Sequence, residues 1–218
     1  MAAKKVAVIL AGCGVYDGSE IYETTITLLS LDQAGVEYQC MAPNIDQMHV
    51  INHLTGEATD ETRNVLVEAA RLARGNIIDL ADANASDYDA LIIPGGFGAA
   101  KNLSSFAVDG AEMTINQDVA ALVKAIHDQG KPVGLICIAP AMTPKLFGEG
   151  TECTIGNDAD TAAAIAAMGG KHQECAVNSF HVDEARKVVT TPAYMLAERI
   201  SEAAEGISKL VSKVIELA

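Results

Sequence analysis

Cys137 is the residue whose type and position most plainly offer chemistry. It directly follows the apolar segment 132–136 and precedes Ala139-Pro140, small residues suited to the first turn of a helix. A sharp turn from a buried strand into a helix lifts its central side chain above the carboxyl edge of a sheet and aims free backbone N–H groups at it. A helix N-terminus also lowers the pKa of a thiol, which makes the nucleophilic thiolate available. The spacing alone fits an unreactive buried cysteine equally well.

Two further features offer the acid and the anion site that addition to a carbonyl group requires. Glu20 and Glu23 lie on the first turns of an expected helix, and Gly95-Gly96 follows an expected buried strand. In an open parallel sheet the crevice lies outside the carboxyl ends of the strands. The loops expected there are residues 11–19, 94–98 and 137–140. A thiol, a carboxyl group and unhindered N–H donors then converge. Taken alone, Glu23 fits better as a solvated helix acid favoured by the helix dipole.

The elements that must position these residues are apolar strands alternating with amphipathic helices. We expect strands at 6–10, 36–42, 89–94, 132–136, 151–155, 180–182 and 187–190, and helices at 20–34, 61–74, 117–129, 138–147, 160–168 and 196–217. Asp17 or Ser19 is expected to cap the first helix. The alternation predicts one α/β domain over residues 1–218, with a doubly wound, mainly parallel sheet and helices on both faces. Residues 44–86 are less regular, with a short hairpin arm at 49–52 and a short extended piece at 77–78, and we interpret them as an insertion beside the sheet.

The charge balance and hydropathy exclude several classes of partner. The net charge is −14, from 29 acidic and 15 basic side chains, which disfavours binding to nucleic acid and to anionic membranes. No run of 18 or more apolar residues occurs, and Met1-Ala2-Ala3-Lys4-Lys5 leads directly into a strand. We therefore expect neither a membrane span nor a secretory signal.

The cysteines and glycine loops argue against disulfides, metals and nucleotide cofactors. The 5 cysteines are an odd number without a C-x-x-C pair, which indicates a reducing cytoplasm and no zinc site. Gly12-Cys13-Gly14 follows the first strand, but Asp17 occupies the place of the third glycine in a dinucleotide-binding motif. We therefore expect no cofactor. Cys13 is either a second thiol in the crevice or a small residue in a tight turn, and the turn is favoured.

Three segments carry a resemblance to a known family: Glu20-Ile21-Tyr22-Glu23-Thr24 within 6–42, residues 91–103 with Pro94-Gly95-Gly96, and Ile136-Cys137-Ile138-Ala139-Pro140. Over nearly the whole chain, the sequence resembles the PfpI-type branch of the class I glutamine-amidotransferase-like superfamily. The resemblance implies a flavodoxin-like fold and a homodimer. It implies that Cys137 is the nucleophile, that Glu23 hydrogen-bonds its sulfur and moves protons, and that the N–H groups of Gly96 and Ile138 form an oxyanion hole.

Two departures from the family pattern bear on the reaction. Ile138 stands where many members have histidine directly after the cysteine, and the nearest counterpart of the late amidotransferase H-x-E is His181-Val182-Asp183. That segment is expected to be a strand entering a turn, so we give His181 no catalytic role. Without a histidine base, amide hydrolysis is disfavoured. We expect a cofactor-independent glyoxalase-like enzyme acting on a small aldehyde; the alternative is a non-catalytic redox-sensing or interaction protein with a reactive Cys137.

Overall fold

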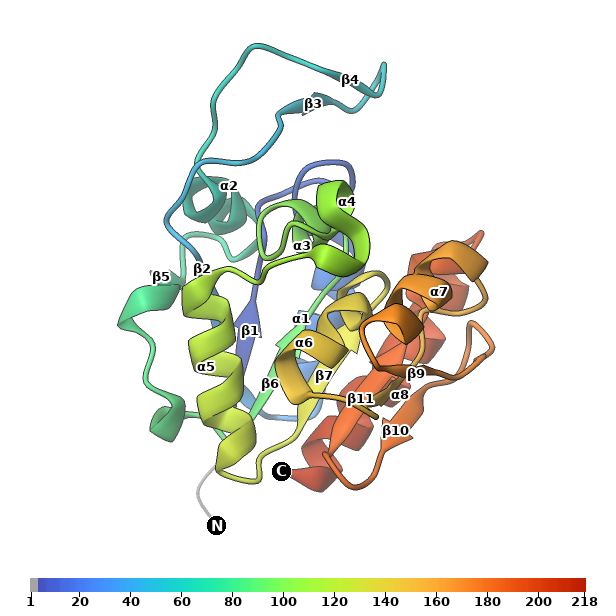
Figure 1. Ribbon diagram of the computed structural model, residues 1–218. Helices are drawn as coiled ribbons and strands as arrows, with labels where there is room; N and C mark the ends of the chain where they lie inside the picture. Colours follow the sequence, from blue (N-terminus) through green and yellow to red (C-terminus); the bar gives the residue numbers. More distant parts are fainter. Residues whose placement is uncertain (1–3) are drawn as a thin grey trace.

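The computed structural model describes residues 4–218 (Figure 1). Its centre is a seven-stranded sheet with the order β10-β11-β7-β6-β1-β2-β5. The strands are β1 (Lys5–Ile9), β2 (Glu37–Ala42), β5 (Ile77–Asp79), β6 (Ala90–Ile93), β7 (Val133–Ile136), β10 (His181–Asp183) and β11 (Val188–Thr191). All pairs are parallel except β10 with β11. The predicted doubly wound, mainly parallel sheet is confirmed.

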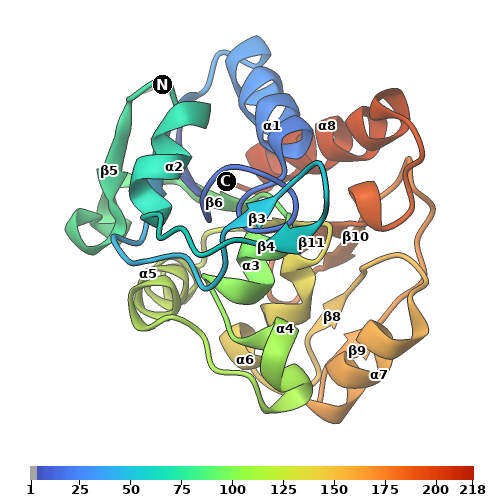
Figure 2. The same ribbon diagram turned by 90° about the horizontal axis from the view of Figure 1, so that it is seen from above.

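Helices cover both faces of this sheet because its buried strands are apolar on both sides. They are α1 (Ile21–Gln33), α2 (Val65–Leu72), α3 (Phe97–Lys101), α4 (Phe106–Asp109), α5 (Gln117–Asp128), α6 (Thr143–Phe147), α7 (Ala159–Ala167) and α8 (Ile200–Leu217). Along β1, Ala7 and Ile9 pack with α5, while Val6 and Val8 pack with α1, α2 and α8. Figure 2 shows α1 and α8 on one side of the sheet and α5 and α6 on the other.

Residues 44–86 differ in part from the predicted insertion beside the sheet. The expected hairpin is present as β3 (Ile51–Asn52) and β4 (Glu57–Ala58), and it projects from the body in Figure 1. However, β5 pairs with β2 as the edge strand of the main sheet, and α2 packs on it. The second half of the segment is therefore a regular part of the doubly wound fold. A three-residue strand is too short to show a clear hydrophobic pattern.

Other boundaries were predicted wrongly where local hydrogen bonding decides them. Helix α2 begins at Val65 instead of residue 61 because Asn64 caps it, accepting the Val67 N–H at 3.0 Å. Helix α1 is capped by Glu20, not by Asp17 or Ser19. Helix α8 begins at Ile200 instead of residue 196, after a short 3-10 turn.

The strands after β7 lie in two places: β10 and β11 belong to the main sheet, and two further strands form a sheet of their own. β10 and β11 form the expected antiparallel pair about a turn. β8 (Glu152–Cys153) pairs instead with β9 (Lys171–His172) in a separate two-stranded sheet. Residues 1–3, part of the sequence argument against a secretory signal, lie outside the described residues. Within residues 4–218, no helix combines the length and apolar character needed to cross a membrane.

Candidate active site

Cys137 occupies a sharp elbow between β7 and the 3-10 turn Ala139–Met142. Its backbone has φ of +65°, a left-handed conformation that costs a non-glycine residue free energy. The Cys137 N–H donates to the Thr191 carbonyl at 2.9 Å, so the neighbouring strand β11 holds the elbow. The side chain is only 8% exposed. The elbow geometry expected from the sequence is present.

Glu23 reaches the same point from the first turn of α1 and is fully buried. Its Oε2 accepts the Gly95 N–H at 3.0 Å, and its Oε1 accepts the Tyr194 N–H at 3.2 Å. The carboxyl group also lies against the Cys137 side chain, since a Cβ added to Gly95 would collide with both of them. Glu23 is therefore not the solvated helix acid of the alternative interpretation. Three contacts from three separate loops fix it beside the sulfur.

Burial raises the pKa of Glu23 to about 8, and the nearby Glu20 carboxyl raises it as well. The hydrogen bonds from Tyr194, Cys137 and Gly95 act in the opposite direction. At neutral pH the Glu23 carboxyl is therefore mostly protonated. An uncharged carboxyl group can donate its O–H to an acceptor, which a carboxylate cannot do.

Burial raises the pKa of the Cys137 thiol well above its ordinary value, and so does the negative charge of an ionised Glu23. The backbone N–H groups of Gly96 and Ile138 lower that pKa because both donate toward the sulfur. The lowered pKa expected from a helix N-terminus is therefore wrong, because burial outweighs the effect of the short 3-10 turn that follows the cysteine. Repulsion between the thiolate and the carboxylate disappears when Glu23 is protonated. The thiol and the acid therefore titrate as a coupled pair that shares protons.

The two glycines after β6 bring the backbone close to the nucleophile. A Cβ on Gly95 would meet the Glu23 Oε2 at 2.6 Å and would also collide with the Cys137 side chain. Gly96 has φ of +95°, and a Cβ there would collide with the backbone of Gly18 and Glu20. The Gly96 N–H is one of the two backbone groups that lower the pKa of the Cys137 thiol. The structure thus brings all four predicted residues, Cys137, Glu23, Gly96 and Ile138, to one point.

Two contacts at this point were not predicted. Tyr194 belongs to the 3-10 turn Ala193–Met195 after β11, and its N–H binds Glu23. Glu20 caps α1 by accepting the Glu23 N–H at 2.7 Å, so a second buried carboxyl lies beside the first. The backbone contact of Tyr194 has no side-chain signature in the sequence. Glu20 was noticed on the same helix turn, but its capping role depends on a side-chain conformation.

Cys13 and His181 lie outside this group. The charged groups that affect the pKa of Cys13 are Glu68, Arg71 and Asp17, on the side of α2, and Cys13 is absent from the lining of the Cys137 cavity. His181 Nε2 lies 3.1 Å from Glu152 Oε2. No histidine lines the Cys137 cavity among the residues that the structure describes.

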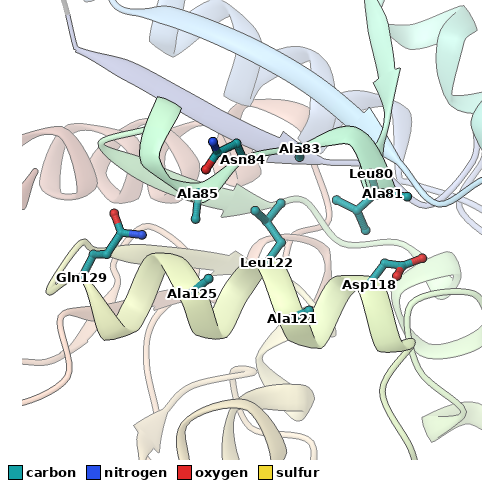
Figure 3. A pocket seen from close by; sticks show the side chains of 10 residues that line it. All are labelled: Leu80, Ala81, Ala83, Asn84, Ala85, Asp118, Ala121, Leu122, Ala125 and Gln129. Atoms are coloured by element: carbon teal, nitrogen blue, oxygen red, sulfur yellow. The ribbon is translucent and has the colours of Figure 1, made fainter.

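The cavity in front of Cys137 has a volume of about 480 Å³. Its apolar lining includes Val15, Phe97, Phe106, Ile138 and Met195. A second cavity of about 390 Å³ lies between residues 80–85 and α5, lined mostly by alanine and leucine (Figure 3). Its described lining contains the carboxylate of Asp118 but no cysteine, serine, threonine or histidine. Over residues 4–218 no three histidine, cysteine or acidic side chains are grouped as metal ligands.

The doubly wound sheet and the cysteine at a strand-to-helix elbow can be compared with known protein families. The family model described as the DJ-1/PfpI family matches residues 4–159. The chain belongs to the DJ-1/PfpI family, within the class I amidotransferase-like superfamily, as the sequence resemblance indicated.

Among individual proteins, the chain is 48% identical over 225 aligned positions to the human glutamine amidotransferase-like class 1 domain-containing protein 3, mitochondrial, covering 99% of this chain and 84% of that protein. It is 34% identical to the zebrafish ES1 protein, mitochondrial, covering 87% and 76%. The crystal structure of an isoprenoid biosynthesis protein with amidotransferase-like domain from Ehrlichia chaffeensis matches with a TM-score of 0.92 and 36% identity over 99% of each chain. Drosophila melanogaster DJ-1beta, at 18% identity and a TM-score of 0.57, shares the fold.

Proposed function

We propose that the protein is a cofactor-independent glyoxalase-like enzyme that converts small α-oxoaldehydes, such as glyoxal, to 2-hydroxy acids, such as glycolate. The observation that carries the proposal is the contact between the Cys137 thiol and the buried carboxyl group of Glu23. Addition to a carbonyl group followed by proton transfer requires a nucleophile, a group that carries protons and N–H donors for the oxyanion, all within reach of one carbonyl group.

The first step is addition of sulfur to the aldehyde carbon. The ionised fraction of Glu23 takes the thiol proton, and the thiolate attacks C1 of the substrate. The N–H groups of Gly96 and Ile138, which donate toward the sulfur in the free protein, are placed to bind the oxyanion that forms. Glu23 returns its proton to that oxygen. The product is a hemithioacetal on Cys137, and Glu23 is again a carboxylate.

The second step moves hydrogen between the two carbons of the substrate. The Glu23 carboxylate removes the proton from C1 and passes it to the C2 oxygen, which gives an enediol. Glu23 then takes the proton of the C1 hydroxyl and returns it to C2, so that no proton is gained or lost overall. C1 is thereby oxidised to a thioester while C2 is reduced to an alcohol, so no external oxidant is consumed. A carboxyl group with a pKa of about 8 is a better base than an ordinary one and is matched to neutral or slightly alkaline pH. Water then cleaves the thioester, releasing the hydroxy acid and the thiol.

An aldehyde suits this site better than an amide does. An aldehyde carbon accepts a thiolate without protonation of a leaving amine, whereas amide cleavage needs an acid for that group. The described lining of the cavity provides no histidine for such a role, because Ile138 follows the nucleophile. We therefore do not propose an amidotransferase reaction for this chain, although the names of its relatives contain that word.

The test is glyoxal turnover by the purified protein and by Cys137→Ser and Glu23→Gln, with glycolate measured by NMR. We expect both variants to lose at least about 100-fold in kcat/KM, the scale of general acid–base and nucleophilic contributions. Cys13→Ser, which changes a thiol outside the cavity, is the matched control and should keep the activity of the parent. Equal turnover by all four proteins would contradict the mechanism.

A second candidate function is oxidation sensing without turnover. The Cys137 sulfur already receives N–H donation from Gly96 and Ile138 and lies against a mostly protonated Glu23, and the same donors would stabilise a sulfinate. Intact mass measurement after mild peroxide distinguishes the two functions. Stoichiometric addition of two oxygens at Cys137 with negligible aldehyde turnover would favour the sensor.

For the assembly and compartment we propose a homodimer in a reducing cytoplasm. The support is the family resemblance for the dimer, and for the compartment the five cysteines, all free in the structure. The names of the human and zebrafish relatives place those proteins in mitochondria. Sedimentation of the purified protein tests the dimer, and fractionation of its source cells tests the compartment.

A further inference from the structure

The cavity in front of Cys137 is much larger than the reaction with glyoxal needs. Its volume of about 480 Å³ falls within the range of about 300–1,000 Å³ typical of pockets for drug-sized ligands. Glyoxal would fill only a small part of it next to the sulfur. The remaining volume must hold either water or another part of the true substrate.

The walls of this remaining volume are apolar. Phe97 and Phe106 come from α3 and α4, Ile138 directly follows the nucleophile, and Met195 comes from the turn after β11. Methionine and aromatic side chains suit apolar ligands of varied shape. Water in such a space finds few hydrogen-bond partners. An apolar arm of the substrate that displaces this water therefore makes the free energy of binding more favourable.

The polar part of the lining favours an uncharged arm over an anionic one. Asp158 lies at the exposed side of the cavity and caps α7, and hydrogen bonds from Thr161 lower its pKa, so it stays negatively charged. No lysine, arginine or histidine occurs in the described lining. The Lys101 ammonium, on the same helix as Phe97, donates to the Tyr16 carbonyl at 2.9 Å. That ammonium lies 5.5 Å from the centroid of the Phe97 ring, outside the cavity lining, so a carboxylate inside the cavity would meet Asp158 with no cation in the lining to pair with it.

We infer that the preferred substrates are α-oxoaldehydes with an uncharged, branched or aromatic apolar arm that lies between Phe97, Phe106 and Met195. The inference rests on the proposed function, and it names the substrate class of the same site. The aldehyde carbon contacts Cys137, and Ile138 bounds the arm where a histidine would make the wall polar. Asp158 disfavours arms that end in a carboxylate.

The first experiment compares kcat/KM for methylglyoxal, isobutylglyoxal and carboxyethylglyoxal, three α-oxoaldehydes that differ only in the arm. We expect isobutylglyoxal to exceed methylglyoxal at least tenfold, since added methylene groups in an apolar pocket contribute about 10–200-fold in discrimination. Carboxyethylglyoxal should have a lower kcat/KM than isobutylglyoxal. The variant Asp158→Asn keeps a side chain that can cap a helix. In this variant, the kcat/KM for carboxyethylglyoxal should rise relative to the kcat/KM for isobutylglyoxal.

The matched variants are Ala107→Phe and Val108→Phe, neighbours on the short helix α4. Both residues are exposed, but Ala107 lines the cavity whereas Val108 does not. A phenylalanine at position 107 adds a large side chain at the cavity wall, where it would take up space for the arm, so the ratio of isobutylglyoxal to methylglyoxal turnover should fall at least tenfold. Val108→Phe carries the same new side chain one position away and should leave the ratio unchanged.

A binding measurement keeps the inference testable apart from turnover. Methyl isobutyl ketone, which has the same arm, should protect Cys137 from alkylation by iodoacetamide in the parent protein but not in Ala107→Phe, and acetone at equal concentration should protect neither. Turnover of methylglyoxal without a preference for isobutylglyoxal would overturn the substrate class and leave the proposed function intact. Absence of all turnover would overturn the proposed function; protection by the ketone would then still support the apolar arm site, and absence of protection would overturn it.

Discussion

The backbone N–H of Gly95 donates to the Oε2 of Glu23 at 3.0 Å, and this bond leaves no space for a side chain at position 95. A Cβ there would lie 2.6 Å from that oxygen and 2.8 Å from the Ile136 carbonyl, and it would overlap the Cys137 side chain. The end of β6 therefore touches the acid and the nucleophile together. Glycine at position 95 is what allows the three segments to meet.

Gly95→Ala should accordingly separate Glu23 from Cys137. We expect a loss of at least about 100-fold in glyoxal kcat/KM and a decrease of about 1–3 kcal/mol in the free energy of unfolding, the usual cost of overpacking. Gly130→Ala is the control: Gly130 has φ of +74° but open space around it, so alanine there costs only backbone strain. Urea denaturation of both variants measures the change in stability, and glyoxal turnover measures the change in activity. A Gly95→Ala protein with parental activity would refute the close contact.

The buried Glu23 should make stability depend on pH in an unusual direction. Its pKa is raised from 4.5 to about 8, so between these values the folded protein holds a proton that the unfolded chain has released. Stability from this group is fully present below pH 4.5 and is lost as pH rises through about 8. The difference amounts to about 5 kcal/mol.

The measurement is the free energy of unfolding from urea titrations between pH 5 and pH 9, in the parent protein and in Glu23→Gln. Glutamine has one acceptor oxygen for the N–H groups of Gly95 and Tyr194, so the variant is less stable by a roughly constant amount. Its pH slope should nevertheless be flatter, because the buried titratable group is gone. Parallel slopes for the two proteins would show that Glu23 titrates normally.

The sequence allowed the sheet and the central chemical residues to be predicted, because both depend on strong local patterns. β6 and β7 are uncharged, mostly apolar segments followed by Pro94-Gly95 and by Cys137, and the carboxyl ends of parallel strands share one edge of the sheet. The burial of Glu23 could not be predicted, since it depends on a backbone contact from Tyr194, 171 residues away. Residues 77–78 were expected to be extended, but the pairing of β5 with the main sheet was missed, because three residues do not show which strand they pair with.

Cys13 should behave as a residue outside the site, although its loop follows β1 at the carboxyl edge. Its electrostatic neighbours are Glu68, Arg71 and Asp17, and it does not line the cavity of Cys137. Methylglyoxal at saturating concentration should therefore protect Cys137 from iodoacetamide and leave the labelling rate of Cys13 unchanged. Peptide mass spectrometry resolves the two sites. Equal protection of both thiols would place Cys13 in the crevice after all.

Glu20 should set the pH at which the enzyme becomes active. The residue is 8% exposed, its carboxyl accepts the Glu23 N–H at 2.7 Å, and its charge raises the pKa of Glu23. Glu20→Gln removes this charge but keeps an oxygen that can cap α1, so the pKa of Glu23 should fall. The rising limb of kcat/KM against pH, which reports ionisation of the base, should then shift to lower pH.

Asp32→Asn provides the matched control, because Asp32 is an exposed acid near the far end of the same helix. Its pH profile should coincide with that of the parent protein. A merely structural role for Glu20 would lower kcat/KM at every pH and leave the position of the limb unchanged. An unshifted limb in Glu20→Gln would therefore show that Glu20 caps α1 without tuning Glu23.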